Sequence, residues 1–142
     1  MSTFQIFNIA AQGMSAQSMR LNTTASNLAN VDSVGSEESV YKSKAPIFAS
    51  FSLEDADVSG VSEESSATGV RVIGIAESHQ PLAKEYQPEN PMANSEGYVF
   101  KTNVNMIQEM ANMISASRSY SNNAEIVNTA KNMMMKTISM GQ

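Results

Sequence analysis

The segment from Asn103 to Gln142 constrains the fold of this chain more than any other stretch of its sequence. It contains no proline, and its first glycine is Gly141. Its apolar side chains, among them Met106 and Ile138, recur at alternating steps of three and four residues. Such steps average 3.5 residues, the period at which one seam of a helix stays against a partner helix. The segment is therefore predicted to form one helix, roughly 55–60 Å long at 1.5 Å per residue, which needs a partner of similar length.

The expected partner is the other end of the chain. Phe7, Met14, Leu21 and Leu28 repeat the same rhythm at intervals of seven residues. Gly13 lies inside this pattern and costs about 1 kcal/mol relative to alanine, so the helix is expected to bend or fray there. Two terminal segments with matching seams predict two long helices that pair as a coiled-coil-like hairpin.

The middle of the chain is predicted to form a small β unit, which makes the expected fold class α+β. We expect residues 1–32 and 103–142 to be the two helices of one helical domain. Residues 33–102 are expected to form a small, acidic, β-rich domain with loops between those helices.

Within the middle segment, Val70–Ala76 is the clearest strand, because it alternates and is rich in β-branched residues. Two shorter strands, Val40–Ala45 and Ile47–Leu53, are expected to be separated by Pro46. Gln80–Pro91 contains three of the four prolines and is expected to be an extended loop.

The charge distribution excludes one class of partner. Residues 1–30 and residues 103–142 each carry a net charge of +1, so a charge of −7 lies in residues 31–102 and brings the total to −5. No cluster of Lys and Arg is available to follow a phosphate backbone, which argues against nucleic-acid binding.

Two further patterns concern membranes and export. No run of 18 apolar residues occurs, so no membrane insertion is expected. The first positively charged side chain is Arg20, and no continuous apolar stretch accompanies it, so no cleaved signal peptide is expected. The chain is therefore expected to be cytoplasmic or to leave the cell by a route that needs no cleaved signal.

Residues that could carry chemistry are scarce. The chain has no cysteine, and its single histidine, His79, stands two residues before Pro81 and is read as a surface residue. The carboxylates between Glu54 and Glu64 do not have the spacing of an EF-hand loop and are read as a solvated acidic turn. Met133–Met135 is read as adaptable packing and not as a copper tract. We expect no catalytic, cofactor-binding or metal-binding residue, and no enzyme.

The last turns of the N-terminal helix, Leu21 to Asn30, are rich in Asn, Thr and Ser, whose side chains compete for backbone groups. One interpretation is a frayed helix end that Asn30 caps. The other is that these polar groups form hydrogen bonds to neighbouring subunits. The pattern alone leaves both open.

Both helical seams are thin, because alanine, serine and methionine occupy many of their positions. The small residues bury little area, each worth on the order of 1 kcal/mol or less. Such helices are expected to become ordered when they pack among copies or relatives of the chain.

Two motifs resemble the rod and hook proteins of the bacterial flagellum, the flagellar axial protein family. The first is Ala25-Ser26-Asn27-Leu28-Ala29-Asn30, preceded by Gln17 and Arg20-Leu21-Asn22. The second runs from Glu96-Gly97-Tyr98-Val99 through Asn103-Val104-Asn105, Glu109-Met110 and Met113-Ile114 to Ala116, Arg118, Tyr120, Asn123, Asn128-Thr129-Ala130-Lys131 and Lys136. The second motif and the short middle segment are most similar to the proximal-rod proteins of this family. The resemblance covers residues 4–30 and 86–142.

The resemblance implies a structural subunit of the flagellar basal-body rod, in its proximal part. Such a protein is exported through the flagellar type III apparatus without a cleaved signal and assembles in the periplasm. Its implied partners are copies of itself, other rod proteins and the export apparatus, and the implied role is a hollow shaft that transmits torque. The alternative is a non-flagellar helical hairpin that serves as an adaptor or scaffold in the cytoplasm.

The candidate functional residues are those of helix packing and of polar contacts between subunits. Expected to pack between helices are Phe7, Met14, Leu21, Leu28, Met110, Ile114, Val127 and Met134. The resemblance favours an inter-subunit role for the polar residues Asn27, Asn30, Asn103, Asn105 and Arg118.

Overall fold

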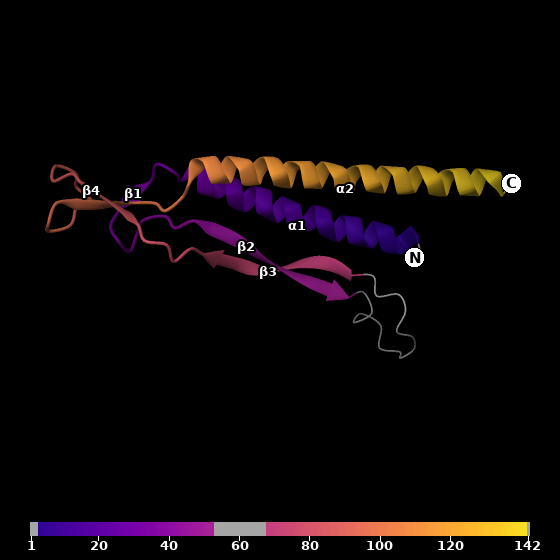
Figure 1. Cartoon of the computed structure of the whole chain (residues 1–142), viewed down its shortest axis with the longest axis horizontal. Coiled ribbons are helices and arrows are strands. Elements are labelled where there is room, and N and C mark those ends of the chain that lie inside the picture. Colours follow the sequence, from indigo (N-terminus) through magenta and orange to yellow (C-terminus); the bar gives the residue numbers. More distant parts are fainter. Residues whose placement is uncertain (1–2, 53–67, 142) are drawn as a thin grey trace. The chain divides into compact units, whose positions relative to one another are not determined.

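The computed structural model describes residues 3–52 and 68–141. Its elements in chain order are α1 (Thr3–Ala29), β1 (Val34–Gly35), β2 (Lys44–Ser52), β3 (Thr68–Glu77), β4 (Ala83–Tyr86), β5 (Tyr98–Lys101) and α2 (Met106–Met140), as Figure 1 shows. Two long terminal helices enclose a small β region in the sequence. The predicted α+β fold class is therefore confirmed.

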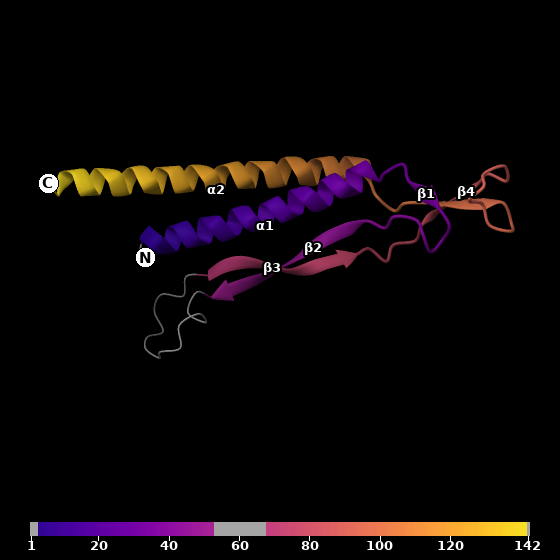
Figure 2. The same ribbon diagram turned by 180° about the vertical axis from the view of Figure 1, so that it is seen from behind.

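The chain divides into two compact units, which we call unit 1 and unit 2. Unit 1 consists of Met1–Met19, Ile47–Gly74 and Ser115–Gln142, and unit 2 of Arg20–Pro46 and Ile75–Ile114. Each unit contains a stretch of α1 beside a stretch of α2, as the views from both sides show (Figures 1 and 2). The predicted domains, with boundaries at residues 32 and 102, stay a prediction.

In unit 1 the two helix stretches meet through small residues. Ala10 and Ala16 of α1 are buried, as are Ala116 and Ala130 of α2. Small side chains allow two helices to approach closely, but each contributes little apolar area. The helix pair of this unit is therefore closely packed and held by a thin apolar seam.

Gly13 lies at such a close approach and does not interrupt α1, which is continuous from Thr3 to Ala29. The expected fraying at this glycine is wrong. A Cβ atom added to Gly13 would lie 2.8 Å from Nδ2 of Asn123 on α2. The missing side chain thus makes room for the Asn123 amide, and packing against α2 offsets the low helix propensity of glycine.

In unit 2 the helices run antiparallel. Arg20 of α1 donates a hydrogen bond from its guanidinium to Oδ1 of Asn112 over 3.1 Å, and Asn27, further along α1, bonds to Glu109, which comes earlier in α2. Residues that follow one another along α1 thus meet residues in reverse order along α2. The predicted pairing of the terminal helices is seen in this unit.

A three-stranded antiparallel sheet with the order β1-β5-β4 belongs to unit 2. Two residues of the central strand β5 are paired on both sides: Phe100 lies opposite Gly35 and Lys84, and Lys101 lies opposite Val34 and Ala83. Val99 and Phe100 are buried, and so is Val40. These three side chains are the apolar core of the unit.

The strands agree with the sequence in part. The predicted strand Val70–Ala76 is confirmed as the centre of β3, which pairs with β2 in a separate two-stranded sheet. Pro46 was expected to separate two strands, but it lies inside β2, where an edge strand tolerates the missing N–H. The loop predicted over Gln80–Pro91 is wrong at its centre, because β4 forms there through pairing with β5. Its three prolines lie outside β4.

In the part of the chain that the structure describes, neither helix has a stretch long and apolar enough to cross a membrane.

Gly13 and Asn123 provide a test of the close helix approach. We expect Gly13→Ala to leave the free energy of unfolding nearly unchanged, because the gain in helix propensity of about 1 kcal/mol is offset by displacement of the Asn123 side chain. In an Asn123→Ala background the same substitution should stabilise by about 1 kcal/mol. Urea unfolding followed by circular dichroism measures both. An identical effect in the two backgrounds would show that the two residues are not in contact.

Candidate assembly interface

The polar end of α1 contains a buried asparagine. The side chain of Asn27 is only 1% exposed. Its Nδ2 donates to the backbone oxygen of Lys44 (2.8 Å) and to Oε2 of Glu109 (3.0 Å), while its Oδ1 accepts from the backbone N–H of Lys44 (2.9 Å) and from the hydroxyl of Tyr41 (2.9 Å). An asparagine amide has two N–H donors and one oxygen with two lone pairs, so its capacity is fully used. Asn27 therefore joins α1, residues 41–44 and α2 within unit 2.

Tyr41 is kept in the protonated state that this network requires. Burial raises the pKa of its phenol, and the carboxylates of Glu109 and Glu77 raise it further. A protonated hydroxyl can donate to Oδ1 of Asn27, whereas a phenolate could not. The ion pair between Lys44 and Glu77, at 3.5 Å, lies nearby on the surface and contributes little.

Two more asparagines organise the start of α2. The backbone N–H of Ser43 donates to Oδ1 of Asn103 over 2.7 Å, and Nδ2 of Asn103 donates to the backbone oxygen of Gln80 over 3.1 Å. Oδ1 of Asn105 accepts from the backbone N–H groups of Ile107 (3.0 Å) and Gln108 (3.2 Å). Asn105 is therefore the N-cap of α2, which satisfies two donors that the first helical turn leaves free.

Asn30 has the capping role that one of the two sequence interpretations gave it. Its Nδ2 donates to the backbone oxygen of Ser26 over 2.8 Å. This carbonyl belongs to the last turn of α1, where the helix provides no N–H partner of its own. The asparagines at the end of α1 and the start of α2 thus complete the backbone hydrogen bonding of the subunit.

The predicted inter-subunit polar residues therefore already have partners inside the chain, with the exception of Arg118, which lies exposed on α2. Asn27 is only 1% exposed and makes its hydrogen bonds inside the chain, and its inter-subunit role stays a prediction. Inter-subunit contacts by Asn30, Asn103, Asn105 and Arg118 stay predictions. Sequence patterns did not reveal Tyr41 and Glu109 as partners of Asn27, because both lie outside the Asn-rich stretch.

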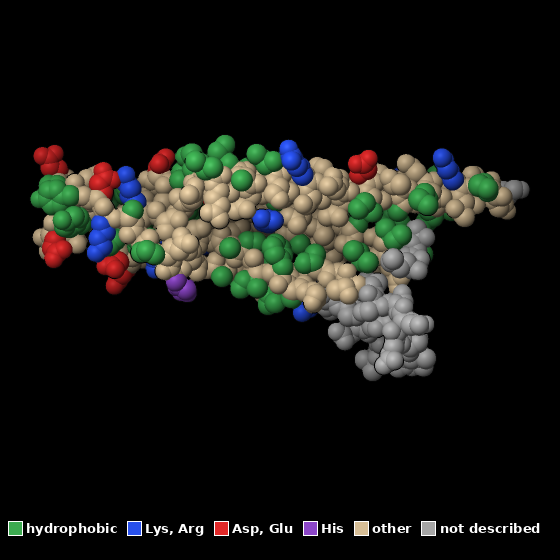
Figure 3. Space-filling view, viewed as in Figure 1, with side chains coloured by type: hydrophobic (Ala, Val, Ile, Leu, Met, Phe, Trp, Pro, Cys, Tyr) green, Lys and Arg blue, Asp and Glu red, His purple; other side chains and the backbone are tan. Residues whose placement is uncertain are grey.

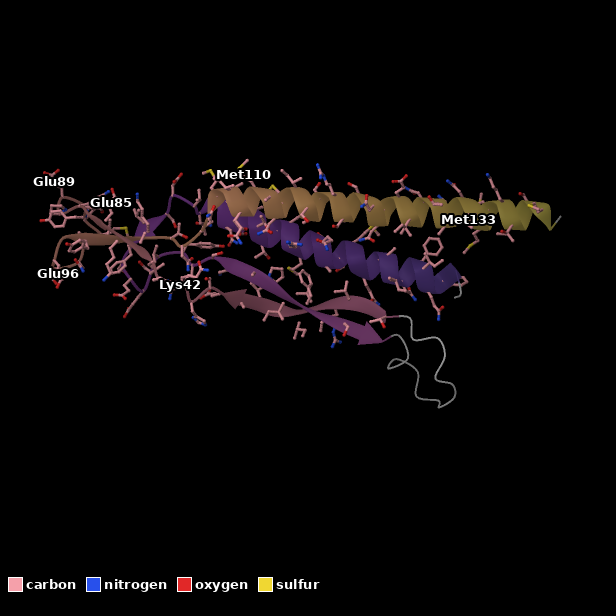
Figure 4. The ribbon with its side chains drawn as sticks, in the orientation of Figure 1. Lys42, Glu85, Glu89, Glu96, Met110 and Met133 are labelled. Atoms are coloured by element: carbon pink, nitrogen blue, oxygen red, sulfur yellow. The ribbon has the colours of Figure 1, made fainter. Side chains whose placement is uncertain are left out.

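The predicted helix-packing residues fall into two groups. Half-buried are Phe7, Met14, Leu21, Leu28, Val127 and Met134. Met110 and Ile114 are instead 50% and 54% exposed, and Figure 4 shows that Met110 points away from α1. Within unit 2, α2 meets α1 through Asn112 and Glu109. Packing of Met110 and Ile114 against another helix stays a prediction.

Met110 and Ile114 belong to a larger exposed surface. We call Met106, Ile107, Met110 and Ile114 the α2 apolar face, whose most exposed member is Ile107 at 81%. Ile107, Met110 and Ile114 are spaced by three and four residues and therefore lie along one side of the helix. Figure 3 shows hydrophobic atoms gathered over the first turns of α2. Glu109 lies among these residues in the sequence and is buried, although it is charged and they are apolar.

Among residues 3–52 and 68–141, no group of three His, Cys, Asp or Glu side chains is placed to hold a metal ion. His79 is exposed, as predicted. The carboxylates between Glu54 and Glu64 lie outside the described residues.

The role of Asn27 can be tested by truncation. We expect Asn27→Ala to lower the free energy of unfolding by about 3 kcal/mol or more, because it leaves partners of a buried amide without hydrogen bonds. Asn22→Ala, an exposed change on the same helix, is the matched control and should stay within about 0.5 kcal/mol of the wild type. Urea unfolding measures both. Equal effects of the two substitutions would contradict the network.

The raised pKa of Tyr41 predicts a pH dependence. A pKa that is higher in the folded than in the unfolded chain stabilises the fold below the unfolded value near 10.0, and this contribution is lost as the pH rises through the folded pKa. The wild type should therefore lose stability relative to Tyr41→Phe above about pH 10. Unfolding measured from about pH 8 to pH 11 gives the difference between the two proteins. A difference that does not change with pH would contradict the prediction.

Comparison with known proteins places these features in a family. The family of flagella basal body rod proteins matches residues 7–35, and the C-terminal family of the flagellar basal body rod FlgEFG proteins matches residues 95–140. These segments contain most of α1, including Asn27, the following residue Asn30, and all of α2.

Full-length relatives agree with the family matches. The flagellar basal-body rod proteins FlgC of Escherichia coli O6:H1 and of Salmonella typhimurium are each 43% identical over 143 residues, which covers 100% of this chain and 100% of the relative. FlgC of Buchnera aphidicola subsp. Acyrthosiphon pisum is 44% identical over 147 residues, with the same full coverage of both chains. The resemblance inferred from the sequence motifs is confirmed, and the chain belongs to the FlgC family of flagellar basal-body rod proteins.

Proposed function

We propose that the chain assembles into the rod through its α2 apolar face, which packs against helices of its own copies and of other rod proteins. One observation carries this proposal. In unit 2, α2 turns Glu109 and Asn112 towards α1 and leaves Ile107, Met110 and Ile114 exposed. A helix that only had to stabilise its own subunit would have the reverse arrangement.

Membership of a structural rod family decides between the functional alternatives. The chain is a structural subunit of the flagellar basal-body rod and not an enzyme. The alternative of a cytoplasmic adaptor gains no support, since the relatives match over the whole chain and carry rod names.

The side chains of the α2 apolar face are larger than the apolar side chains that are fully buried in the helices. Complete burial of one isoleucine or methionine side chain is worth about 1.5–3 kcal/mol. The buried apolar residues of the helices are alanines, namely Ala10, Ala16, Ala116 and Ala130. Neighbours that cover the α2 apolar face would therefore add more stability than the burial of these small side chains provides. This linkage is why assembly is expected to stabilise the helices.

The finer parts of this function rest on the resemblance of the two terminal motifs. We place the chain in the proximal part of the rod, in the periplasm, after export through the flagellar type III apparatus without a cleaved signal peptide. In the rod, torque would pass through many lateral helix contacts instead of one strong interface. Met110 and Ile114, predicted as packing residues, would make such contacts between subunits.

The α2 apolar face can be removed without touching the subunit's interior. In a variant with Ile107→Gln, Met110→Gln and Ile114→Gln, we expect association of the purified chain to be lost, while the free energy of unfolding of the dilute chain changes by less than about 1 kcal/mol. Sedimentation velocity over a range of concentrations measures association, and urea unfolding measures stability.

A matched control replaces exposed apolar residues elsewhere. Ile73→Gln with Ile75→Gln alters two exposed side chains of β3 and should leave association unchanged. Association of the triple variant at the wild-type level would reject the α2 apolar face as the assembly surface. A collapse of its stability would mean that the face belongs to the subunit's own core.

A further inference from the structure

The end of the β4–β5 hairpin in unit 2 carries an exposed aromatic patch with acidic side chains around it. Tyr86 and Tyr98 lie opposite each other in the register and contact edge to face, with 5.3 Å between ring centroids. Tyr86 is nevertheless 62% exposed, and Met92 beside the hairpin end is 48% exposed. Hydrophobic atoms are flanked by acidic ones at this end of the molecule (Figure 3).

Two carboxylates of this patch are free to meet a partner. Glu85 already forms an ion pair with Lys101. Glu89 and Glu96 lie at the hairpin end in Figure 4 and form no ion pair with any residue of the described chain. We call Tyr86, Met92 and Tyr98 with Glu89 and Glu96 the acidic tip.

The last turns of α2, in unit 1, have the complementary character. Met133, Met135 and Ile138 are each more than 60% exposed, although they are apolar. Lys131 and Lys136 stand among them in the sequence, and neither forms an ion pair with a described residue. Lys131 is followed four residues later by Met135, and Lys136 is preceded three residues earlier by Met133, so each lysine has an exposed methionine beside it on the helix. We call these five residues the basic end.

The described residues of unit 1 and those of unit 2 carry net charges of opposite sign. Unit 2 contains five Lys and Arg side chains and eight Asp and Glu side chains, a net charge of −3. The described residues of unit 1 contain four Lys and Arg side chains and one Glu, a net charge of +3. The five carboxylates between Glu54 and Glu64 lie outside the described residues; they also belong to unit 1 and bring the net charge of its whole sequence to −2.

From this complementarity we propose that the acidic tip of one copy binds the basic end of α2 in a second copy. Glu89 and Glu96 would pair with Lys131 and Lys136 at the rim, while the tyrosine rings of the tip cover the exposed methionines. Lysine ammonium groups also bind favourably over exposed tyrosine rings. The proposal rests on the proposed assembly function and names the contact that joins successive copies.

The partner is another copy because the chain itself supplies both halves of the contact. Two different patches that bind each other make a head-to-tail interface. Each time a copy joins the series, one acidic tip and one basic end remain unoccupied at its two ends and can bind further copies. An isologous dimer would instead require each patch to bind its own kind, and like charges would then face each other. The arrangement of charge therefore favours a growing series of copies over a closed pair.

Charge reversal tests the pairing on the full chain. The tip variant combines Glu89→Lys with Glu96→Lys, so that both of its patches are basic. The end variant combines Lys131→Glu with Lys136→Glu, so that both of its patches are acidic. Alone, each variant should associate about tenfold more weakly than the wild type at about 50 mM salt, because attractive pairs become repulsive.

A mixture of the two variants in equal amounts should recover association. In an alternating series, one joint is the wild-type pair and the next is the reversed pair, so every joint is attractive again. Sedimentation velocity measures the three samples, and the wild type should associate more weakly at about 0.5 M salt. Glu37→Lys with Glu38→Lys makes the same change of charge elsewhere in unit 2 and serves as the matched control, which should behave as the wild type.

The outcomes separate the two proposals. If the wild type associates and each variant alone associates equally well, or if the mixture fails to recover, the pairing of tip and end is overturned while assembly stands. If the wild type remains monomeric at every concentration and salt, self-assembly of the chain falls together with the pairing. Circular dichroism of each variant confirms that the exposed substitutions leave the helices intact.

Discussion

The hydrogen bonds of Asn27 are the interaction on which unit 2 depends. One buried amide binds the backbone of Lys44 in both directions, the hydroxyl of Tyr41 and the carboxylate of Glu109. Apolar contacts between small side chains allow two helices to pack in many different registers. Hydrogen bonds are short and directional, so they are satisfied in only one register. The network therefore sets the register of α1 against α2 in a unit whose apolar core is small.

Because polar and small residues make the contacts inside the subunit, the large apolar residues of α2 can lie on its exposed side. The interior contacts that define the subunit are made by polar and small residues, such as Glu109, Asn112 and Ala116. Ile107 and Met110 are then left exposed on the surface. Under the proposed function, specificity within the chain and adhesion between chains would come from different faces of one helix.

Sequence patterns predicted the elements that depend on local periodicity. Both terminal helices and the centre of β3 follow from the spacing of apolar residues between positions 3 and 140. β4 was missed because its partner β5 lies beyond a stretch rich in proline, and pairing between distant segments overrides the local preference. Gly13 was misjudged for a similar reason, since its environment is an amide of the other helix.

The candidate site was harder to predict than the fold. The motifs singled out the correct asparagines as unusual, but a sequence pattern does not say whether a polar group finds its partner inside or outside the subunit. The partners of Asn27 are 14 to 82 residues away in sequence. Likewise, the 3.5-residue rhythm predicts that Met110 and Ile114 pack against a helix but does not say which one.

The exposed surfaces of α2 contain methionine at Met106, Met110, Met133 and Met135. Methionine is unbranched and adopts many shapes at low cost, so it fits against surfaces of different form. A rod built from several kinds of protein has joints at which one sequence gives way to another. A methionine-rich exterior would let one subunit sequence pack against neighbours of different shape at such a joint, because the flexible side chains can adopt a different conformation against each one.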